Sequence, residues 1–132
     1  MFDEDYFCYT EEVEYCTRVR RAGFKVIYTH QAKIWHKKPI KAKFQQKIPQ
    51  QRNAIALAIY YQGRNKFRFM KKHATKRQYH NFLLYFFGYY FWFMTGVHLV
   101  YHHDIKWLVS FYRGVRDGLF DSAVYANLYS KD

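Results

Sequence analysis

The chain has 132 residues, enough for one domain with a hydrophobic core. Its 22 Lys and Arg against 10 Asp and Glu give a formal net charge of +12, which favours anionic partners such as phosphates, nucleic acid or lipid headgroups. Aromatic residues make up 23% of the chain, which excludes a disordered tail and suits half-wet surfaces, including a membrane interface. Two cysteines exclude a disulfide framework and fit a reduced, cytoplasm-facing environment.

The first fourteen positions hold six of the ten carboxylates, although the rest of the chain is basic. A helix is predicted from Tyr9 to Ala22, with Thr10 as its N-cap and acidic residues in the first turn, where the helix dipole favours negative charge. Arginines follow at its C-terminal end, and Gly23 is suited to stop it. Glu14 and Arg18 are four residues apart and are expected to pair.

Two short apolar stretches follow this helix. The stretches FKVIY (24–28) and AKIW (32–35) are predicted to be short strands. The segment 37–49 carries five lysines and Pro39, and it is predicted to be a basic, mobile loop. A helical pattern returns from Gln51 to Lys72.

The stretch Phe82 to Tyr101 has no Asp, Glu, Lys or Arg. As a helix it would be roughly 30 Å long, enough to cross the hydrocarbon core of a membrane. Its many tyrosines fit an interfacial helix equally well, so the sequence leaves spanning and surface-lying arrangements open. Helical spacing then continues from Ile105 to Leu119, with basic residues largely off the apolar stripe, as in an amphipathic helix that lies on a membrane or packs on a core.

The stretch FDEDYFCYTEEVEYCTRVRRAGFKVIYTHQAKIWHK resembles a segment of the inverting family-two glycosyltransferases, in particular their rhamnosyltransferase-like members. Two later elements resemble the same family in the same order: YYQGRN, with its Tyr-x-x-Arg-Asn, and RGVRDGL, with its Arg-Gly-x-x-Asp-Gly. The matching positions in the first stretch are Phe2, Asp3, Glu4, Phe7, Cys16, Arg18, Arg21, Gly23 and His36.

This resemblance implies an α/β fold, namely the C-terminal portion of a GT-A (Rossmann-like) fold with few short strands, followed by a mostly helical C-terminal extension. The expected division is an acceptor-side catalytic part (1–48), a helical segment with the Arg-Asn element (49–80), and membrane-associated helices (81–132). The nucleotide-binding N-terminal half of such enzymes, with its Asp-x-Asp element, has no counterpart here. The resemblance therefore implies a chain that supplies the acceptor side, needs this missing half as a partner, and is inactive alone.

The resemblance places the catalytic base at Glu12, where the family has an Asp at the start of the helix. A carboxylate there takes the proton of the acceptor hydroxyl as its oxygen attacks the sugar. Asp3, Glu4, Asp5 and Glu11 are expected to bind the acceptor, because carboxylates accept several hydrogen bonds from sugar hydroxyls. The alternative for all of these acids is a solvated acidic turn and an ordinary first-turn set that stabilises the helix.

The resemblance also assigns residues on the donor side. Arg64 and Asn65 are expected at the donor diphosphate, since an arginine can neutralise the leaving group, and the alternative is a cation on a helix surface. His36 is expected to join the Asp-x-Asp element as a ligand of a divalent metal, Mn²⁺ or Mg²⁺, in the complete enzyme. Its alternative is a polar strand end, and no metal is expected on this chain alone.

The expected function is transfer of a sugar from a nucleotide-sugar to a lipid-linked or cell-surface glycan. A membrane surface is the expected partner, with the chain at its cytoplasmic face, because basic residues precede the apolar stretch, at Lys71, Lys72, Lys76 and Arg77. One alternative is a nucleic-acid-binding module; the aromatics cluster where charges are absent, so no nucleic-acid partner is expected. A non-enzymatic membrane anchor and an inactive remnant are the others.

Overall fold

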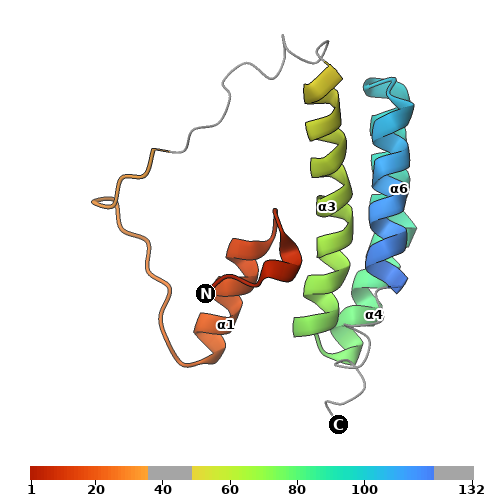
Figure 1. Ribbon diagram of the computed structural model, residues 1–132. Helices are drawn as coiled ribbons and strands as arrows, with labels where there is room; N and C mark the ends of the chain where they lie inside the picture. Colours follow the sequence, from red (N-terminus) through yellow and green to blue (C-terminus); the bar gives the residue numbers. More distant parts are fainter. Residues whose placement is uncertain (36–48, 121–132) are drawn as a thin grey trace.

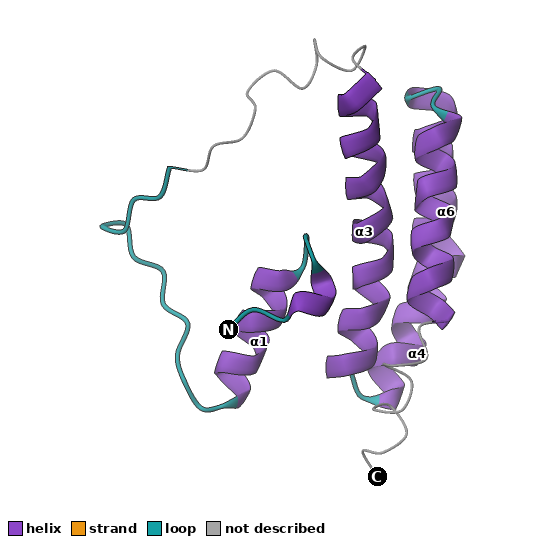
Figure 2. Ribbon diagram, in the orientation of Figure 1, coloured by secondary structure: helices purple, strands orange, loops and turns teal. Residues whose placement is uncertain are grey.

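The computed structural model describes residues 1–35 and 49–120, and in these ranges all of the regular secondary structure is helical (Figures 1 and 2). A short 3₁₀ helix, η1 (Glu4–Tyr6), precedes α1 (Glu11–Arg21). After an extended segment and the undescribed stretch comes α3 (Pro49–His73). The remaining elements are α4 (Lys76–Tyr85), the π-helical η2 (Phe86–Tyr90), α5 (Phe91–Gly96), the π-helical η3 (Val97–Tyr101) and α6 (Ile105–Phe120).

The predicted α/β fold class is wrong for the described residues, because they contain no strand (Figure 2). Residues 24–28 and 32–35 form an extended segment whose side chains are all exposed, including Tyr28 and Trp35. A strand exists only when its backbone groups pair with a neighbouring strand. No described residue offers that pairing, so the β-rich composition of the segment is not enough to make a sheet. The GT-A-type architecture is therefore replaced by an all-helical one.

The helix predictions are confirmed. The first helix ends as expected in a Schellman arrangement, in which the N–H of Gly23 donates to Arg20 and that of Phe24 donates to the Val19 carbonyl oxygen, 3.1 Å in each case. Gly23 has a φ of 86°, which a residue with a Cβ adopts only at a cost. The ion pair between Glu14 and Arg18 also forms, at 2.8 Å.

Helix α3, helix α6 and the long run from Lys76 to Tyr101 pack together as a three-helix bundle (Figure 1). Its core is aromatic: the ring of Phe67 on α3 lies 4.7 Å from Phe86, and the ring of Phe91 lies 5.8 Å from Phe111 on α6. Thr75 starts the long run with a capping box, in which its side chain and that of Gln78 each accept a hydrogen bond from the other residue's backbone N–H.

Two glycines of α6 set how closely it approaches α3. A Cβ on Gly114 would lie 2.2 Å from the carbonyl oxygen of Tyr60, and one on Gly118 would lie 2.7 Å from that of Arg64. The Tyr60 hydroxyl donates to Asp117 at 3.0 Å across the same interface. The RGVRDGL element, which the resemblance singled out, thus forms a close contact between two helices.

Candidate functional site

The N-terminal loop has a strained backbone. Phe7, Tyr9 and Thr10 all have positive φ, at 59°, 65° and 76°, although none is a glycine. For residues with a Cβ, and most of all for a β-branched one, this region of the Ramachandran map is costly and persists only where the surroundings enforce it. Thr10 also makes no side-chain cap hydrogen bond, contrary to its predicted N-cap role, because its left-handed backbone differs from the extended geometry of a cap.

The side chain of Asn65 holds this loop in place. It is fully buried on α3, and its amide nitrogen donates to three backbone carbonyl oxygens: those of Tyr6 (3.0 Å), Cys8 (2.8 Å) and Tyr9 (2.7 Å). Its carbonyl oxygen accepts from the Arg64 guanidinium at 3.1 Å. Since an amide nitrogen has two hydrogens, the three acceptors share them, and no other side chain of this size offers the same set of partners.

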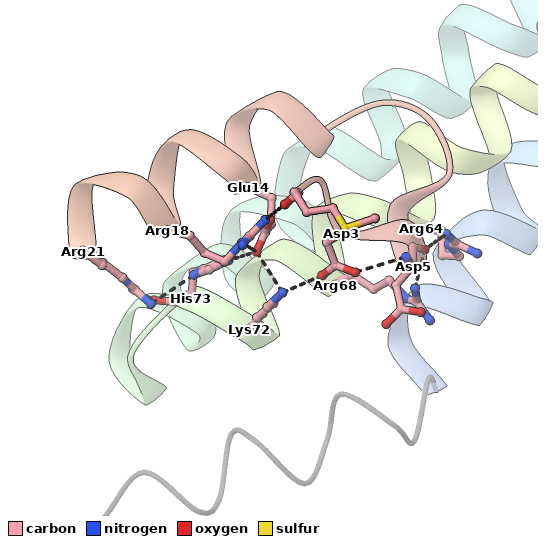
Figure 3. Close-up of polar contacts among 10 residues, drawn as sticks. Asp3, Asp5, Glu14, Arg18, Arg21, Arg64, Arg68, Lys72 and His73 are labelled. Atoms are coloured by element: carbon pink, nitrogen blue, oxygen red, sulfur yellow. Dashed lines mark hydrogen bonds and ion pairs between the residues drawn. The ribbon is translucent and has the colours of Figure 1, made fainter. Parts of the chain in front are cut away.

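Two arginines of α3 fix the segment just before the strained loop. Both Arg64 (2.7 Å) and Arg68 donate to the carbonyl oxygen of Asp5 (Figure 3). The guanidinium of Arg64 also lies over the ring of Tyr61, 4.7 Å from its centroid, where cation–π attraction adds to the hydrogen bonds. The Tyr-x-x-Arg-Asn element of α3 thus binds the backbone of the acidic segment.

A buried carboxylate, Glu14, anchors α1 to the end of α3 (Figure 3). It accepts from Arg18 at 2.8 and 2.9 Å, and its ion pair with Lys72 is 2.8 Å long. Burial alone would raise the pKa of Glu14, but the hydrogen bonds from Lys72 and Arg18 outweigh it and hold the pKa below its usual value. Lys72 also pairs with Asp3, whose pKa is lowered in the same way: burial opposes the shift and the Lys72 hydrogen bond produces it.

His73 completes this cluster in a neutral form. The Arg21 guanidinium donates to its Nδ1 (3.0 Å), so its Nε2 carries the proton that it gives to Glu14 (3.2 Å). Burial lowers the pKa of His73 and outweighs the attraction of Glu14. Sequence reasoning did not single out Arg68, Lys72 or His73 as partners of the acidic segment. The recurrence of cations on α3 at intervals of three and four residues is the signal that would have indicated them.

The predicted acceptor-side acids lie around this anchored loop. Glu12 is exposed in the first turn of α1, and Glu4 and Asp5 are exposed in η1. Asp3 is half-buried and engaged by Lys72, and the Glu11 carboxylate is partly buried, with one oxygen that has no hydrogen-bond partner among the described residues. The structure therefore brings the five predicted carboxylates to one short segment and leaves three of them open to solvent.

The predicted donor-side residues fall in different places. Arg64 and Asn65 lie next to each other on α3 and face the acidic segment, with Asn65 wholly enclosed. His36 lies outside the described residues. Within residues 1–35 and 49–120, no group of three or more His, Cys, Asp or Glu side chains is arranged to hold a metal ion.

A separate groove of about 640 Å³ lies between α3 and α6. It combines polar and apolar side chains, with cations on the α6 side, and is lined by Asn53, Ala56, Leu57, Tyr60, Lys106, Ser110, Arg113, Arg116 and Asp117.

A scan against protein-family models and searches of curated proteins and of solved structures found no match to this chain.

Proposed function

We propose that this chain supplies the acceptor-side part of an inverting glycosyltransferase, with Glu12 as its catalytic base. One observation supports the proposal above the others. The segments that resemble the glycosyltransferase elements, residues 2–9 and 60–65, are far apart in the sequence and in direct contact in the structure, through the hydrogen bonds of Arg64 and Asn65. Both segments are therefore parts of one packed unit.

The anchored loop would serve catalysis by fixing where the first turn of α1 begins. A base is effective only when it is held within hydrogen-bond reach of the proton that it removes. Strained backbone held by a buried side chain is common at functional sites, where it positions reactive groups. Glu12 lies in the first turn of α1, two residues after the strained Thr10.

In the proposed reaction, the carboxylate of Glu12 takes the proton from an acceptor hydroxyl. The freed oxygen attacks the anomeric carbon of the donor sugar, and the bond from that carbon to the nucleotide diphosphate breaks, so the diphosphate leaves with the electron pair. Glu4 and Asp5 would accept hydrogen bonds from other hydroxyls of the acceptor. The nucleotide-sugar would be bound by a separate part.

Sugar transfer is tested in membranes from cells that carry the intact gene, with radiolabelled nucleotide-sugars as donors and lipid-extractable label as the readout. Glu12→Gln should reduce incorporation about 100-fold or more, since a general base contributes on this scale. Glu12→Asp keeps a carboxylate and is the matched control, expected to retain most of the transfer. Equal incorporation by Glu12→Gln and wild type would exclude Glu12 as the base, and no incorporation by the wild type with any donor would overturn the function.

The same proposal includes a membrane surface as the place of action, with the basic residues ahead of the long apolar helix at the cytoplasmic face. Among the described residues, one helix, Lys76–Tyr101, is long and apolar enough by length and composition to cross a membrane. This agrees with a lipid-linked acceptor, whose sugar would be presented at the bilayer surface.

A further inference from the structure

The long helix Lys76–Tyr101 has two unlike faces. Its inner face packs in the bundle, with Phe86 and His98 almost wholly buried. Its outer face is an exposed apolar stripe, in which Leu84 is 62%, Trp92 65% and Val100 68% accessible. This outer stripe consists of Leu84, Tyr85, Tyr89, Trp92, Phe93, Leu99 and Val100.

An exposed apolar stripe of this kind indicates a surface that binds a partner. Monomeric soluble proteins seldom expose a continuous apolar surface of this extent, and those that do use it to bind membranes or other proteins. The outer stripe has two tyrosines, a tryptophan and a phenylalanine. Tyr and Trp are the side chains enriched where a protein meets the boundary between lipid headgroups and acyl chains.

From these features we infer that the helix lies in the plane of a membrane, with its outer stripe sunk into the headgroup–acyl boundary, and does not cross the bilayer. The inference builds on the membrane part of the proposed function, but it is independent of sugar transfer. The neighbours of the helix oppose crossing, and the charge of the bundle favours an anionic bilayer.

The long helix runs antiparallel to α3 and α6; its first half contacts α3, its second half contacts α6, and α6 itself packs along α3 (Figure 1). Near one end Phe82 lies 5.2 Å from Phe67 in ring centroids, in the middle Tyr90 contacts Lys66, and beyond the other end Asp104 pairs with Arg52 at 2.7 Å. If the long helix crossed a bilayer, α3 would have to cross beside it. Helix α3 carries six Lys and Arg residues and no acid, so placing it in hydrocarbon would be very costly.

An in-plane helix avoids this cost. With the outer stripe facing the bilayer, α3 and α6 stay on the side that faces water, because the long helix packs on both of them through its opposite face. Helix α6 continues the surface at the edge of the stripe, where Tyr112 stacks on Phe91 (5.2 Å between ring centroids). The two exposed cations at the start of the long helix, Lys76 and Arg77, then lie at the level of the headgroups.

The charge of the bundle indicates which occupant covers the stripe. Residues 49–120 contain eleven Lys and Arg and two Asp, and no Glu. A second copy of this chain would bring an equally positive bundle to the contact, and like charges oppose such an approach. An anionic lipid surface is complementary, because each basic residue near it is attracted within about one Debye length.

Vesicle binding of the full chain tests the inference. We expect co-sedimentation with vesicles of phosphatidylcholine and phosphatidylglycerol, weaker binding to phosphatidylcholine alone, and partial loss of binding as salt is raised. The double variant W92Q/F93Q should lower the partition coefficient roughly 100-fold, since each large side chain contributes about tenfold or more when buried. The control is V13Q, which alters an exposed apolar residue of α1 outside the stripe and should bind as the wild type does.

The orientation of the helix is tested by depth measurements. Single cysteines at Leu84, Trp92 and Val100, in a background of C8S and C16S, receive spin labels whose depth is read from oxygen and nickel accessibility. We expect three similar, shallow depths. A deep label at 92 with shallow labels at 84 and 100 on opposite leaflets would show a crossing helix and overturn the inference.

Two further outcomes would overturn it as well. One is the absence of vesicle binding together with a dimer that W92Q/F93Q dissolves, because the stripe would then be an interface between copies. The other is vesicle binding that W92Q/F93Q leaves unchanged. The proposed enzymatic role fails or stands separately, since E12Q should bind vesicles normally whether or not Glu12 is a base.

Discussion

The amide nitrogen of Asn65 lies 2.7 Å from the carbonyl oxygen of Tyr9, a residue with a φ of 65° and 56 positions away in the sequence. The same nitrogen reaches the carbonyl oxygens of Tyr6 and Cys8, so one buried side chain satisfies three backbone acceptors in a segment that has no regular hydrogen-bond ladder. Buried carbonyl groups need such partners. The shape of the loop therefore depends on a residue of α3.

Asn65→Asp should destabilise the protein by about 3 kcal/mol. The substitution keeps the size of the side chain but replaces its donor by a second acceptor, which faces carbonyl oxygens in a buried site. Urea unfolding gives the free energy, and hydrogen exchange of the amides of residues 7–12 should accelerate. Gln62→Ala alters an exposed neighbour on the same helix and should leave both measurements unchanged. Stability within 0.5 kcal/mol of wild type, a range typical of surface changes, would show that Asn65 does not hold the loop.

Thr10→Gly should stabilise the protein by about 0.5–1 kcal/mol. Thr10 has a φ of 76° and no side-chain cap hydrogen bond, so a glycine relieves the strain and loses no cap. Thr75 stands at the same position of another helix with a φ of −71° and a complete capping box, and Thr75→Gly should lower stability by a few tenths of a kcal/mol. Thermal or urea unfolding of both variants checks the opposite signs. Two losses of equal size would contradict a strained Thr10.

Residues with strong local signals were predicted well. The bounds of α1 were predicted to within two residues at its start and one at its end. The signals were the acids at its start, the arginines at its end and Gly23, and each of them acts within a single turn. The stretch Phe82 to Tyr101 was predicted to be helical from its lack of charged residues, which is also a signal carried by neighbouring positions. The strands at 24–28 and 32–35 were predicted wrongly because a strand depends on partners that no local pattern contains.

Less of the candidate site could be predicted from the sequence. The acids of residues 3–12 were expected together because they are neighbours in the chain. The roles of Lys72 and Asn65 depend on the docking of α1 against α3, which no spacing within either segment encodes. The positive φ of Phe7, Tyr9 and Thr10 could not be predicted either, because residues with a Cβ rarely adopt it and nothing in their sequence indicates it.

Gly114→Ala should destabilise the protein by about 3 kcal/mol. The new Cβ would lie 2.2 Å from the Tyr60 carbonyl oxygen, a backbone atom that cannot move unless the two helices separate. Gly88 is the matched control: it is also in a helical segment, but a Cβ there meets nothing within 4 Å, so Gly88→Ala should be neutral or stabilise by about 0.5 kcal/mol. Lipid-free urea unfolding measures both. A loss at position 88 as large as at 114 would mean that close packing of α6 on α3 is not the cause.

The ion-pair cluster of Glu14 should make stability depend on pH in the acidic range. The folded-state pKa of Glu14 lies below the usual value of 4.5, so its contribution is complete above pH 4.5 and is lost as the pH falls through the folded-state value. Burial also lowers the pKa of His73 below 6.5. The unfolded chain therefore binds this proton more tightly than the folded protein does, so the free energy of unfolding decreases as the pH falls below 6.5. The free energy of unfolding should therefore decrease in two stages on acidification.

Glu14→Gln separates the two stages. It should cost about 2 kcal/mol at pH 7, below the range for a fully buried pair because the side chains of Arg18 and Lys72 are 39% and 32% exposed. Its stability should then fall less steeply than that of the wild type below pH 4.5, while Asp3 still titrates in both proteins. Glu12→Gln, at an exposed position of the same helix turn, should keep the wild-type profile. Urea unfolding at pH 7, 5.5, 4 and 3 gives the comparison, and parallel curves for wild type and Glu14→Gln would mean that Glu14 is not the source of the acidic stage.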